Sequence, residues 1–155
     1  MGSYNFKSVG QKPEDVRNLA VSASLPPVGI KTPLQLNSSG GLFEMNYDLE
    51  AQTADNLRNL LQTNWGERLG QFQFGANLKP LTSNYTSQDN FDSEAIVRIK
   101  DTVTRWMPYI DLIDFVSTYN RLDNKSTGII NVEIGYNIPS LNITGKKIQV
   151  VLYVI

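Results

Sequence analysis

Residues 128–139, "GIINVEIGYNIP", constrain the fold of this chain most, because apolar and polar side chains alternate along them. A period of two places every second side chain on the same face of a β-strand. The apolar face carries Ile130, Val132, Ile134, Tyr136 and Ile138. The chain is therefore expected to build a sheet with one face turned toward a core, which other elements must cover.

Two nearby segments supply further predicted strands. "YIDLIDFVSTYN" (109–120) is rich in β-forming residues but alternates poorly, which predicts a bulge or a buried strand. The turn-rich "DNKSTG" (123–128) predicts that this strand and the next form a hairpin. The final "KKIQVVLYVI" (146–155) predicts a strand that runs to the last residue.

The final strand carries apolar side chains on both of its faces. One face holds Ile148, Val150, Leu152 and Val154, and the other holds Val151, Tyr153 and Ile155. A strand with one solvated face should alternate, so we expect both faces to be covered. Two explanations are open. Another protein chain covers the sheet or extends its edge, or the N-terminal arm of this chain folds over it.

Two segments have the helical period. Residues 49–63 carry an apolar stripe, and Gly66 is placed to end this helix in a left-handed conformation, with Trp65 packing back on the last turn. Residues 91–108 form a second predicted helix, which Pro108 ends. The first stripe consists of Ala54, Leu57, Leu60 and Leu61. The second consists of Ile96, Ile99, Val103 and Trp106, with Asp92 or Ser93 as the expected cap.

The remaining segments are predicted to be less regular. Residues 80–90 are polar and predict an exposed loop, while residues 1–47 are rich in Pro and Gly and predict an N-terminal arm. Within the arm, residues 14–22 have the features of a helix start, and "KTPLQL" and "LFEMNY" flank the turn-rich "NSSGG" as a short hairpin would. Two interpretations of the arm are open: it becomes ordered by packing on another surface, or it is a flexible terminus.

The expected fold is α+β: two main helices packed on a small mixed or antiparallel sheet in a domain of residues 48–155, preceded by an extended arm of residues 1–47.

Composition excludes several classes of function. The chain has a net charge of −1 and no basic cluster, which argues against nucleic acid and membrane partners. It has no cysteine and no histidine, so thiolate chemistry and the commonest general base are absent. Together with the lack of a signal-peptide pattern, this predicts a soluble intracellular product.

The stretch "TNWGERLGQFQFG" (63–75) is the best candidate for chemistry, because it places an acid and a base among glycines and rings. A glycosidase needs two carboxylates, one with a raised pKa. Asp89, Asp92 and Glu44 are candidate partners for Glu67, but their spacing selects none of them. A neighbouring Arg68 would lower the pKa of Glu67, which is wrong for a general acid. We therefore predict no catalytic, metal-binding or cofactor-binding residue. Gly66, Glu67, Arg68 and Gly75 are predicted to brace a turn, while Phe72 and Phe74 hold the next segment to the core.

Residues 56–81, "NLRNLLQTNWGERLGQFQFGANLKPL", resemble the signature of the phage baseplate wedge proteins that initiate the contractile tail sheath. In that family a helix "L-x-x-L-L-x-T-x-x-G-E-R" is followed by a Phe-Gly and a leucine-bearing turn. The matching residues are Asn56, Leu57, Asn59, Leu60, Leu61, Thr63, Gly66, Glu67, Arg68, Phe74, Gly75 and Leu78. The resemblance extends over residues 49–155, and type VI secretion baseplates carry relatives. An older lysozyme label on this family finds no support in these residues.

The resemblance implies a structural, non-enzymatic baseplate protein of a phage virion, assembled in the host cytoplasm and present once in each baseplate wedge. Its implied partners are the tail sheath protein and the helical core bundle of the other wedge proteins, with hub or tube proteins as further candidates. The implied mechanism is β-augmentation, in which the sheet accepts a strand of the first sheath ring. The strand expected to bind the sheath contains Ile148, Val150, Val151, Leu152 and Tyr153.

The chain departs from the family at the junction between the second helix and the next strand. The family commonly has Glu-Pro-Arg there, a motif tied to docking on the core bundle, whereas this chain has Met107-Pro108-Tyr109. The expected contact is therefore apolar and aromatic, carried by Trp106, Met107, Pro108 and Tyr109. Two other functions are open: a different sheath-like tail protein, such as a tail terminator or a sheath fragment, and a cell-wall glycosidase.

Overall fold

The computed structural model describes residues 26–37, 42–84, 88–121 and 128–154. The chain divides into two compact units, one ending at Asp55 and one beginning at Asn56. The boundary falls within helix α2 (Leu49–Gln62), so this helix contributes residues to both units.

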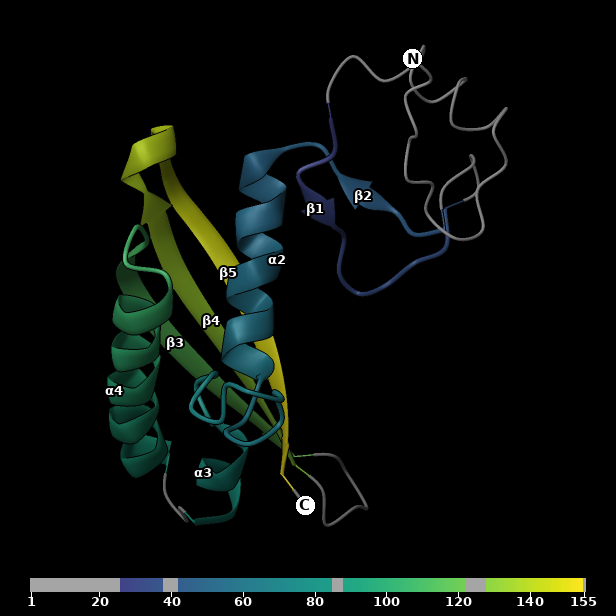
Figure 1. Ribbon diagram of the computed structural model, residues 1–155. Coiled ribbons are helices and arrows are strands. Elements are labelled where there is room, and N and C mark those ends of the chain that lie inside the picture. The colour runs from purple at the N-terminus through teal and green to yellow at the C-terminus, as the bar shows by residue number, and fades with distance from the viewer. Residues whose placement is uncertain (1–25, 38–41, 85–87, 122–127, 155) are drawn as a thin grey trace, which may run out of the picture. The chain divides into compact units, whose positions relative to one another are not determined.

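The unit of residues 56–155 is built on a three-stranded antiparallel sheet in the order β3-β4-β5 (Figure 1). These strands are β3 (Asp111–Arg121), β4 (Gly128–Ile138) and β5 (Ile143–Val154), and the short 3-10 helix η1 (Pro139–Leu141) joins the last two. The register between β3 and β4 shifts between Leu112 and Asp114, so the predicted bulge is confirmed. The predicted hairpin loop at 123–128 falls almost entirely outside the described residues.

The core of this unit lies against one face of the sheet. All five residues predicted for the apolar face of β4 are buried, and so are Ile148, Val150 and Leu152 of β5. On the opposite face Val151 is 38% exposed and Tyr153 is 62% exposed. No described residue of this chain covers these two side chains, so the face that the sequence predicts to be covered by another chain or by the N-terminal arm is open here. The side chains of Val154 and Ile155 lie outside the described residues.

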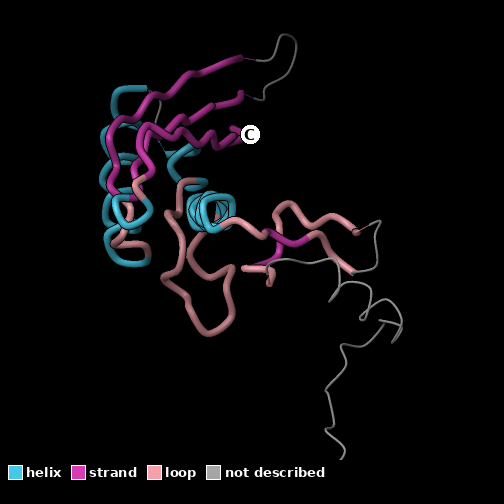
Figure 2. Tube along the Cα trace, turned by 90° about the horizontal axis from the view of Figure 1, so that it is seen from above, coloured by secondary structure: helices cyan, strands magenta, loops and turns pink. Residues whose placement is uncertain are grey.

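Helices α2, α3 (Lys79–Asn84) and α4 (Gln88–Trp106) lie on the same side of this sheet (Figure 2). Their apolar residues close the core: Leu57, Leu60 and Leu61 of α2, Leu81 of α3, and Phe91, Ala95, Ile99 and Val103 of α4. The α+β prediction with two main helices is confirmed. Helix α2 ends one residue before the predicted boundary at Thr63.

Three details of the sequence prediction are wrong. Helix α4 begins at Gln88, so Asp92 and Ser93 lie inside it and cannot cap it, and Ile96 of the predicted stripe is 43% exposed. Helix α3 occupies part of the predicted loop 80–90, and its Leu81 is completely buried. Pro80 is compatible with this helix because the first turn does not require its missing N–H.

The unit that ends at Asp55 contains the predicted hairpin. Strands β1 (Gly29–Ile30) and β2 (Met45–Asn46) pair in antiparallel fashion, and Leu36 bridges Phe43. Buried Asp55 accepts hydrogen bonds from the Thr32 N–H and from Asn46 Nδ2, each at 2.9 Å, which tie this hairpin to the first turns of α2. The predicted helix at 14–22 lies outside the described residues.

Candidate functional site

The turn that follows α2 is ordered by Glu67. Its carboxylate accepts hydrogen bonds from the Asn64 N–H at 2.7 Å and from Asn64 Nδ2 at 2.9 Å. These two bonds lower the pKa of Glu67 below its ordinary value, with a smaller contribution from the charge of Lys79. The direction agrees with the sequence argument, but the cause is Asn64 and not Arg68.

Glycines and an indole close the same turn. Gly66 has a φ of 87°, and its N–H bonds to the Phe72 carbonyl at 2.8 Å. Gly75 has a φ of 107° and packs against the carbonyl of Thr63 so closely that a Cβ would not fit. Trp65 Nε1 donates to the Gly75 carbonyl at 3.0 Å. Residues 64–75 therefore form a compact loop that these hydrogen bonds close.

The two phenylalanines of this loop behave differently. Phe74 packs against the core, with its ring centroid 5.2 Å from that of Trp106 and the Arg68 guanidinium 4.3 Å from it on one face. Phe72 is 71% exposed, so the prediction that it holds the segment to the core is wrong. Leu69, which precedes both phenylalanines in the sequence, is fully exposed.

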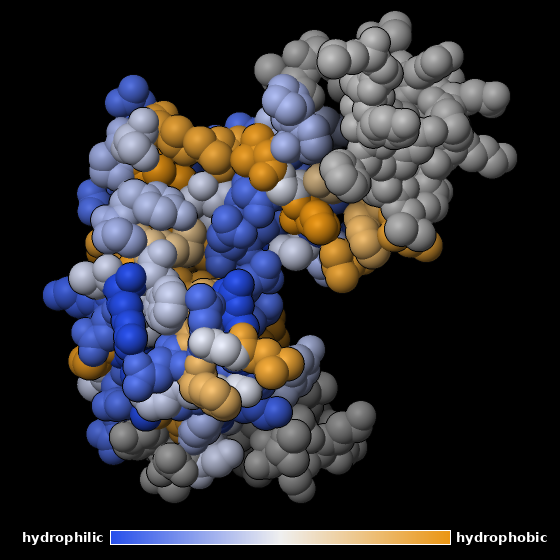
Figure 3. All heavy atoms as spheres, viewed as in Figure 1, coloured by the Kyte–Doolittle hydropathy of each residue, from blue (hydrophilic) through white to orange (hydrophobic). Residues whose placement is uncertain are grey.

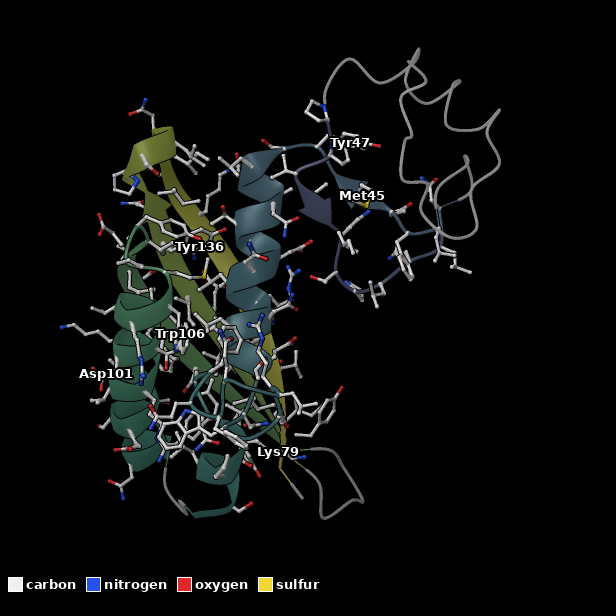
Figure 4. The ribbon with its side chains drawn as sticks, in the orientation of Figure 1. Met45, Tyr47, Lys79, Asp101, Trp106 and Tyr136 are labelled. Atoms are coloured by element: carbon white, nitrogen blue, oxygen red, sulfur yellow. The ribbon has the colours of Figure 1, made fainter. Side chains whose placement is uncertain are left out.

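A groove of about 630 Å³ brings together two sets of residues that the sequence analysis treated separately. Glu67 and Arg68 come from the loop, and Trp106, Met107 and Tyr109 come from the end of α4 and the junction to β3. Asn56, Asn59, Leu60, Thr63 and Phe74 complete the lining. Trp106 lies on the side of α4 that faces α2 (Figure 4). We refer to this feature as the junction groove.

The four predicted docking residues differ in their access to solvent. Met107 is only 5% exposed and belongs to the core, and Trp106 is half-buried. Pro108 and Tyr109 are exposed, Tyr109 to 45%, and partial burial raises the pKa of its hydroxyl. A partner in the junction groove would therefore meet Tyr109 and the accessible part of Trp106, whereas Met107 offers it little surface.

The described lining of the junction groove offers one carboxylate for acid–base chemistry. Glu67 is the one carboxylate among the described residues that line it, and the pKa of this carboxylate is lowered. Hydrolysis of a glycosidic bond uses two carboxylates, one of them an acid with a raised pKa. Across the described residues, no cluster of three or more acidic, histidine or cysteine side chains could hold a metal ion.

Both outer strands of the three-stranded sheet are unpaired on their outer side within the described part of the chain. A groove of about 650 Å³ follows β3, lined mainly by α4 and β3. A second groove, of about 500 Å³, borders the end of β5 and is lined by α2, the residues after it, and Lys79. Of the five residues predicted to bind the sheath, Ile148, Val150 and Leu152 point into the core, whereas Val151 and Tyr153 are exposed on the open face.

Sequence reasoning missed the groove beside β3. Ile96 and Ile113, which line it, are 43% and 56% exposed. A signal for it was present at Ile113, which breaks the alternation of its strand at the bulge. Ile113 shares this groove with Ile96 because of the way α4 crosses the sheet, and no local sequence pattern encodes that crossing.

No protein-family model and no curated protein matches the sequence. Among solved structures, a chain of the anti-feeding prophage (AFP) baseplate is similar, with a TM-score of 0.58 and 16% identity over 77% of this chain and 90% of that chain. A candidate tail lysozyme from Geobacter sulfurreducens matches with a TM-score of 0.49 and 21% identity over 68% of this chain and 89% of that chain. None of the described helices is both long enough and apolar enough to cross a bilayer. The chain shares its fold with a component of a baseplate.

Proposed function

We propose that this chain is a structural component of a contractile-tail baseplate, a wedge protein that seeds the tail sheath. One observation carries the proposal: a folded sheet whose two outer strands are both free along their edges within the described part of the chain. Natural proteins usually protect such edges, because an exposed edge pairs with other chains. The fold that this chain shares with a chain of the AFP baseplate supports a place in a baseplate.

In this proposal β5 receives an extended strand of the first sheath ring. Main-chain hydrogen bonds would supply affinity, and alternate side chains would fix the register. Val151 and Tyr153 would contact the added strand on the open face. Ile148, Val150 and Leu152 would act indirectly, by anchoring β5 to the core.

The junction groove is the proposed docking surface for the other wedge proteins, including their helical core bundle. Its lining combines the aromatic side chains of Phe74, Trp106 and Tyr109 with the polar side chains of Asn56, Asn59 and Arg68. Protein interfaces likewise combine aromatic side chains with polar ones. Baseplate hub or tube proteins are further candidate partners. The location is the tail baseplate of the virion, reached after assembly in the host cytoplasm.

Docking can be tested with two tyrosines of similar exposure. Tyr109 is 45% exposed and lines the junction groove, whereas Tyr119 is 49% exposed on β3 and does not. Tyr109→Ala should leave a folded chain that no longer co-purifies with the other wedge proteins, and Tyr119→Ala should retain them. A folded Tyr109→Ala variant that still co-purifies would contradict docking at this groove.

Strand addition can be tested on the two edges separately. Val151 of β5 and Val116 of β3 are exposed on the same open face, to 38% and 52%. A lysine on an edge strand blocks pairing with another chain. Val151→Lys should abolish co-assembly with the sheath protein while Val116→Lys preserves it. The reverse result would mean that the strand is added to β3. If neither substitution has an effect, strand addition is contradicted.

We propose that the chain is not an enzyme, since the described lining of the junction groove has one carboxylate and that carboxylate favours its ionised form. A turbidity assay on peptidoglycan tests this directly. Clearing by the wild type that disappears in Glu67→Gln would establish a cell-wall glycosidase and overturn the structural proposal. Electron microscopy of the particle tests the remaining alternative, because density away from the baseplate–sheath junction would assign the chain to another tail protein.

A further inference from the structure

The loop of residues 64–75 presents apolar side chains to solvent at its tip. Leu69 is fully exposed, Phe72 is 71% exposed, and both project from the loop between Gly66 and Gly75. In Figure 3 apolar surface lies over the region of this loop, among hydrophilic atoms. Burying a Leu or Phe side chain contributes about 1.5–3 kcal/mol. The free chain gains none of this at Leu69 and little at Phe72.

The loop tip is exposed although hydrogen bonds connect the backbone of the loop on both sides of it. The Gly66 N–H bonds to the Phe72 carbonyl at 2.8 Å and joins the two ends of the tip. Within the tip, the Gln71 N–H bonds to the Arg68 carbonyl at 3.2 Å, and Gly70 has a φ of 78°. At its far side, Arg105 Nη1 donates to Gln73 Oε1 at 2.8 Å. A side chain on a fixed loop binds a partner with a smaller loss of conformational entropy than one on a mobile loop.

The tip is continuous with the junction groove. Glu67 and Arg68 line that groove, and Leu69 is the next residue along the chain. A protein seated on Trp106 and Tyr109 therefore reaches the start of the tip. Interfaces are strongest where an apolar anchor enters a pocket on the partner.

We propose that Leu69 and Phe72 form an anchor that inserts into an apolar pocket of the protein that occupies the junction groove. This inference rests on the proposed docking function and adds a second contact to it. A lipid surface fits less well, because the chain has a net charge of −1 and its sequence has no basic cluster. Insertion of two side chains without a basic surface gives weak membrane binding.

The absence of cysteine from the sequence allows a direct test. Single variants Leu69→Cys, Phe72→Cys and Tyr109→Cys place one thiol at the tip or in the groove. Leu42→Cys, at a residue that is 61% exposed in the other unit, is the control. The rate of maleimide alkylation is measured for the free chain, for tail particles purified from the producing cells, and for the free chain mixed with vesicles of phosphatidylcholine and phosphatidylglycerol.

We expect all the exposed thiols to react rapidly in the free chain. In the particle, the Leu69→Cys and Phe72→Cys thiols should react at least about ten-fold more slowly, because the centre of an interface excludes solvent. Rapid reaction at the tip together with protection of Tyr109→Cys would overturn the anchor and leave groove docking intact. Rapid reaction at all three sites, or absence of the chain from any particle, would overturn both. Slower alkylation of the tip thiols in the presence of vesicles would overturn the anchor and show that the tip binds a membrane.

A charge substitution provides the matching functional test. Leu69→Asp should reduce incorporation into the particle at least about ten-fold, since it places a carboxylate in an apolar pocket. Leu42→Asp is the matched control and should be incorporated as well as the wild type. Both positions are exposed, so circular dichroism should show the same folded state for both variants. Normal incorporation of Leu69→Asp would contradict the anchor.

Discussion

Single residues decide the conformation of the turn after α2. Gly66, Gly70 and Gly75 all have positive φ angles, but their surroundings differ. A Cβ added to Gly66 or Gly70 would meet no atom within 4 Å, whereas at Gly75 it would collide with the Thr63 carbonyl. Gly75 is therefore required for two reasons, its backbone conformation and the close approach of the chain to the end of α2.

This difference predicts unequal costs for the same substitution. Gly70→Ala should lower the free energy of unfolding by about 1–2 kcal/mol, the usual cost of a left-handed conformation for a non-glycine residue. Gly75→Ala should cost about 3 kcal/mol or more, because the backbone must also move. Urea denaturation followed by circular dichroism measures both values. Equal costs would mean that the contact with Thr63 relaxes freely.

Glu67 should make stability depend on pH. The Asn64 hydrogen bonds lower its pKa from the ordinary value of 4.5, so the ionised carboxylate stabilises the folded state above that value. This contribution is lost as the pH falls through the lower pKa of the folded state. Glu67→Gln should therefore be less stable than the wild type at neutral pH, and the difference in stability should narrow as the pH falls below about 4.5.

Denaturation of both chains across the pH range tests this prediction. Asp101→Asn, at an exposed carboxylate of α4, is the control and should follow the wild type throughout. A gap that stays constant between neutral and acidic pH would show that Glu67 acts through its shape and not through its charge.

At the scale of elements, the faces of β5 have separate roles. Val150 is completely buried beneath the helices, and the adjacent Val151 is 38% exposed on the open face. The same substitution at neighbouring positions therefore separates core packing from the open face. Both faces of this strand are apolar in sequence, which is why the sequence alone suggested that both are covered.

Val150→Ala should lower the free energy of unfolding by about 2 kcal/mol, because it removes buried methyl groups and leaves a cavity. Val151→Ala should cost less than about 1 kcal/mol in the isolated chain, since it removes little buried surface. Urea denaturation of the two variants gives this comparison. A large cost for Val151→Ala would mean that part of the chain covers the open face in solution.

At the scale of the whole molecule, the apolar core belongs to one unit. Every residue of the buried hydrophobic cluster lies between Leu57 and Leu152, within the unit that begins at Asn56. The described residues of the other unit form a short hairpin and the first turns of α2, and they expose several apolar side chains, including Leu34 and Leu36. The core therefore does not depend on apolar residues of that hairpin.

A chain truncated to residues 48–155 should consequently fold on its own. It keeps Asp48, whose carboxylate accepts a hydrogen bond from the Ala51 N–H at 3.2 Å and begins α2. Cooperative thermal unfolding, followed by circular dichroism, is the expected result. Loss of the cooperative transition would show that residues 1–47 contribute to the core.

The sequence by itself determined the elements whose period is set by one buried face. The alternation through β4 and the stripe Leu57, Leu60, Leu61 on α2 follow directly from which side chains must leave water. The α+β class and the bulge of β3 were also accessible, because local residue preferences and periodicity agree there. The fixed turn around Glu67 was predicted from an acid and glycines at a helix end.

Only the tertiary structure decided which residues share a surface. It buried Met107, exposed Phe72 and Ile96, formed α3 in a polar segment, and joined Glu67 to the sequence-distant Tyr109 in one groove. These outcomes depend on how α2 and α4 cross the sheet, and each crossing is set by many side chains at once. A period in the sequence states that a face is buried, but the packing of the elements selects what lies against it.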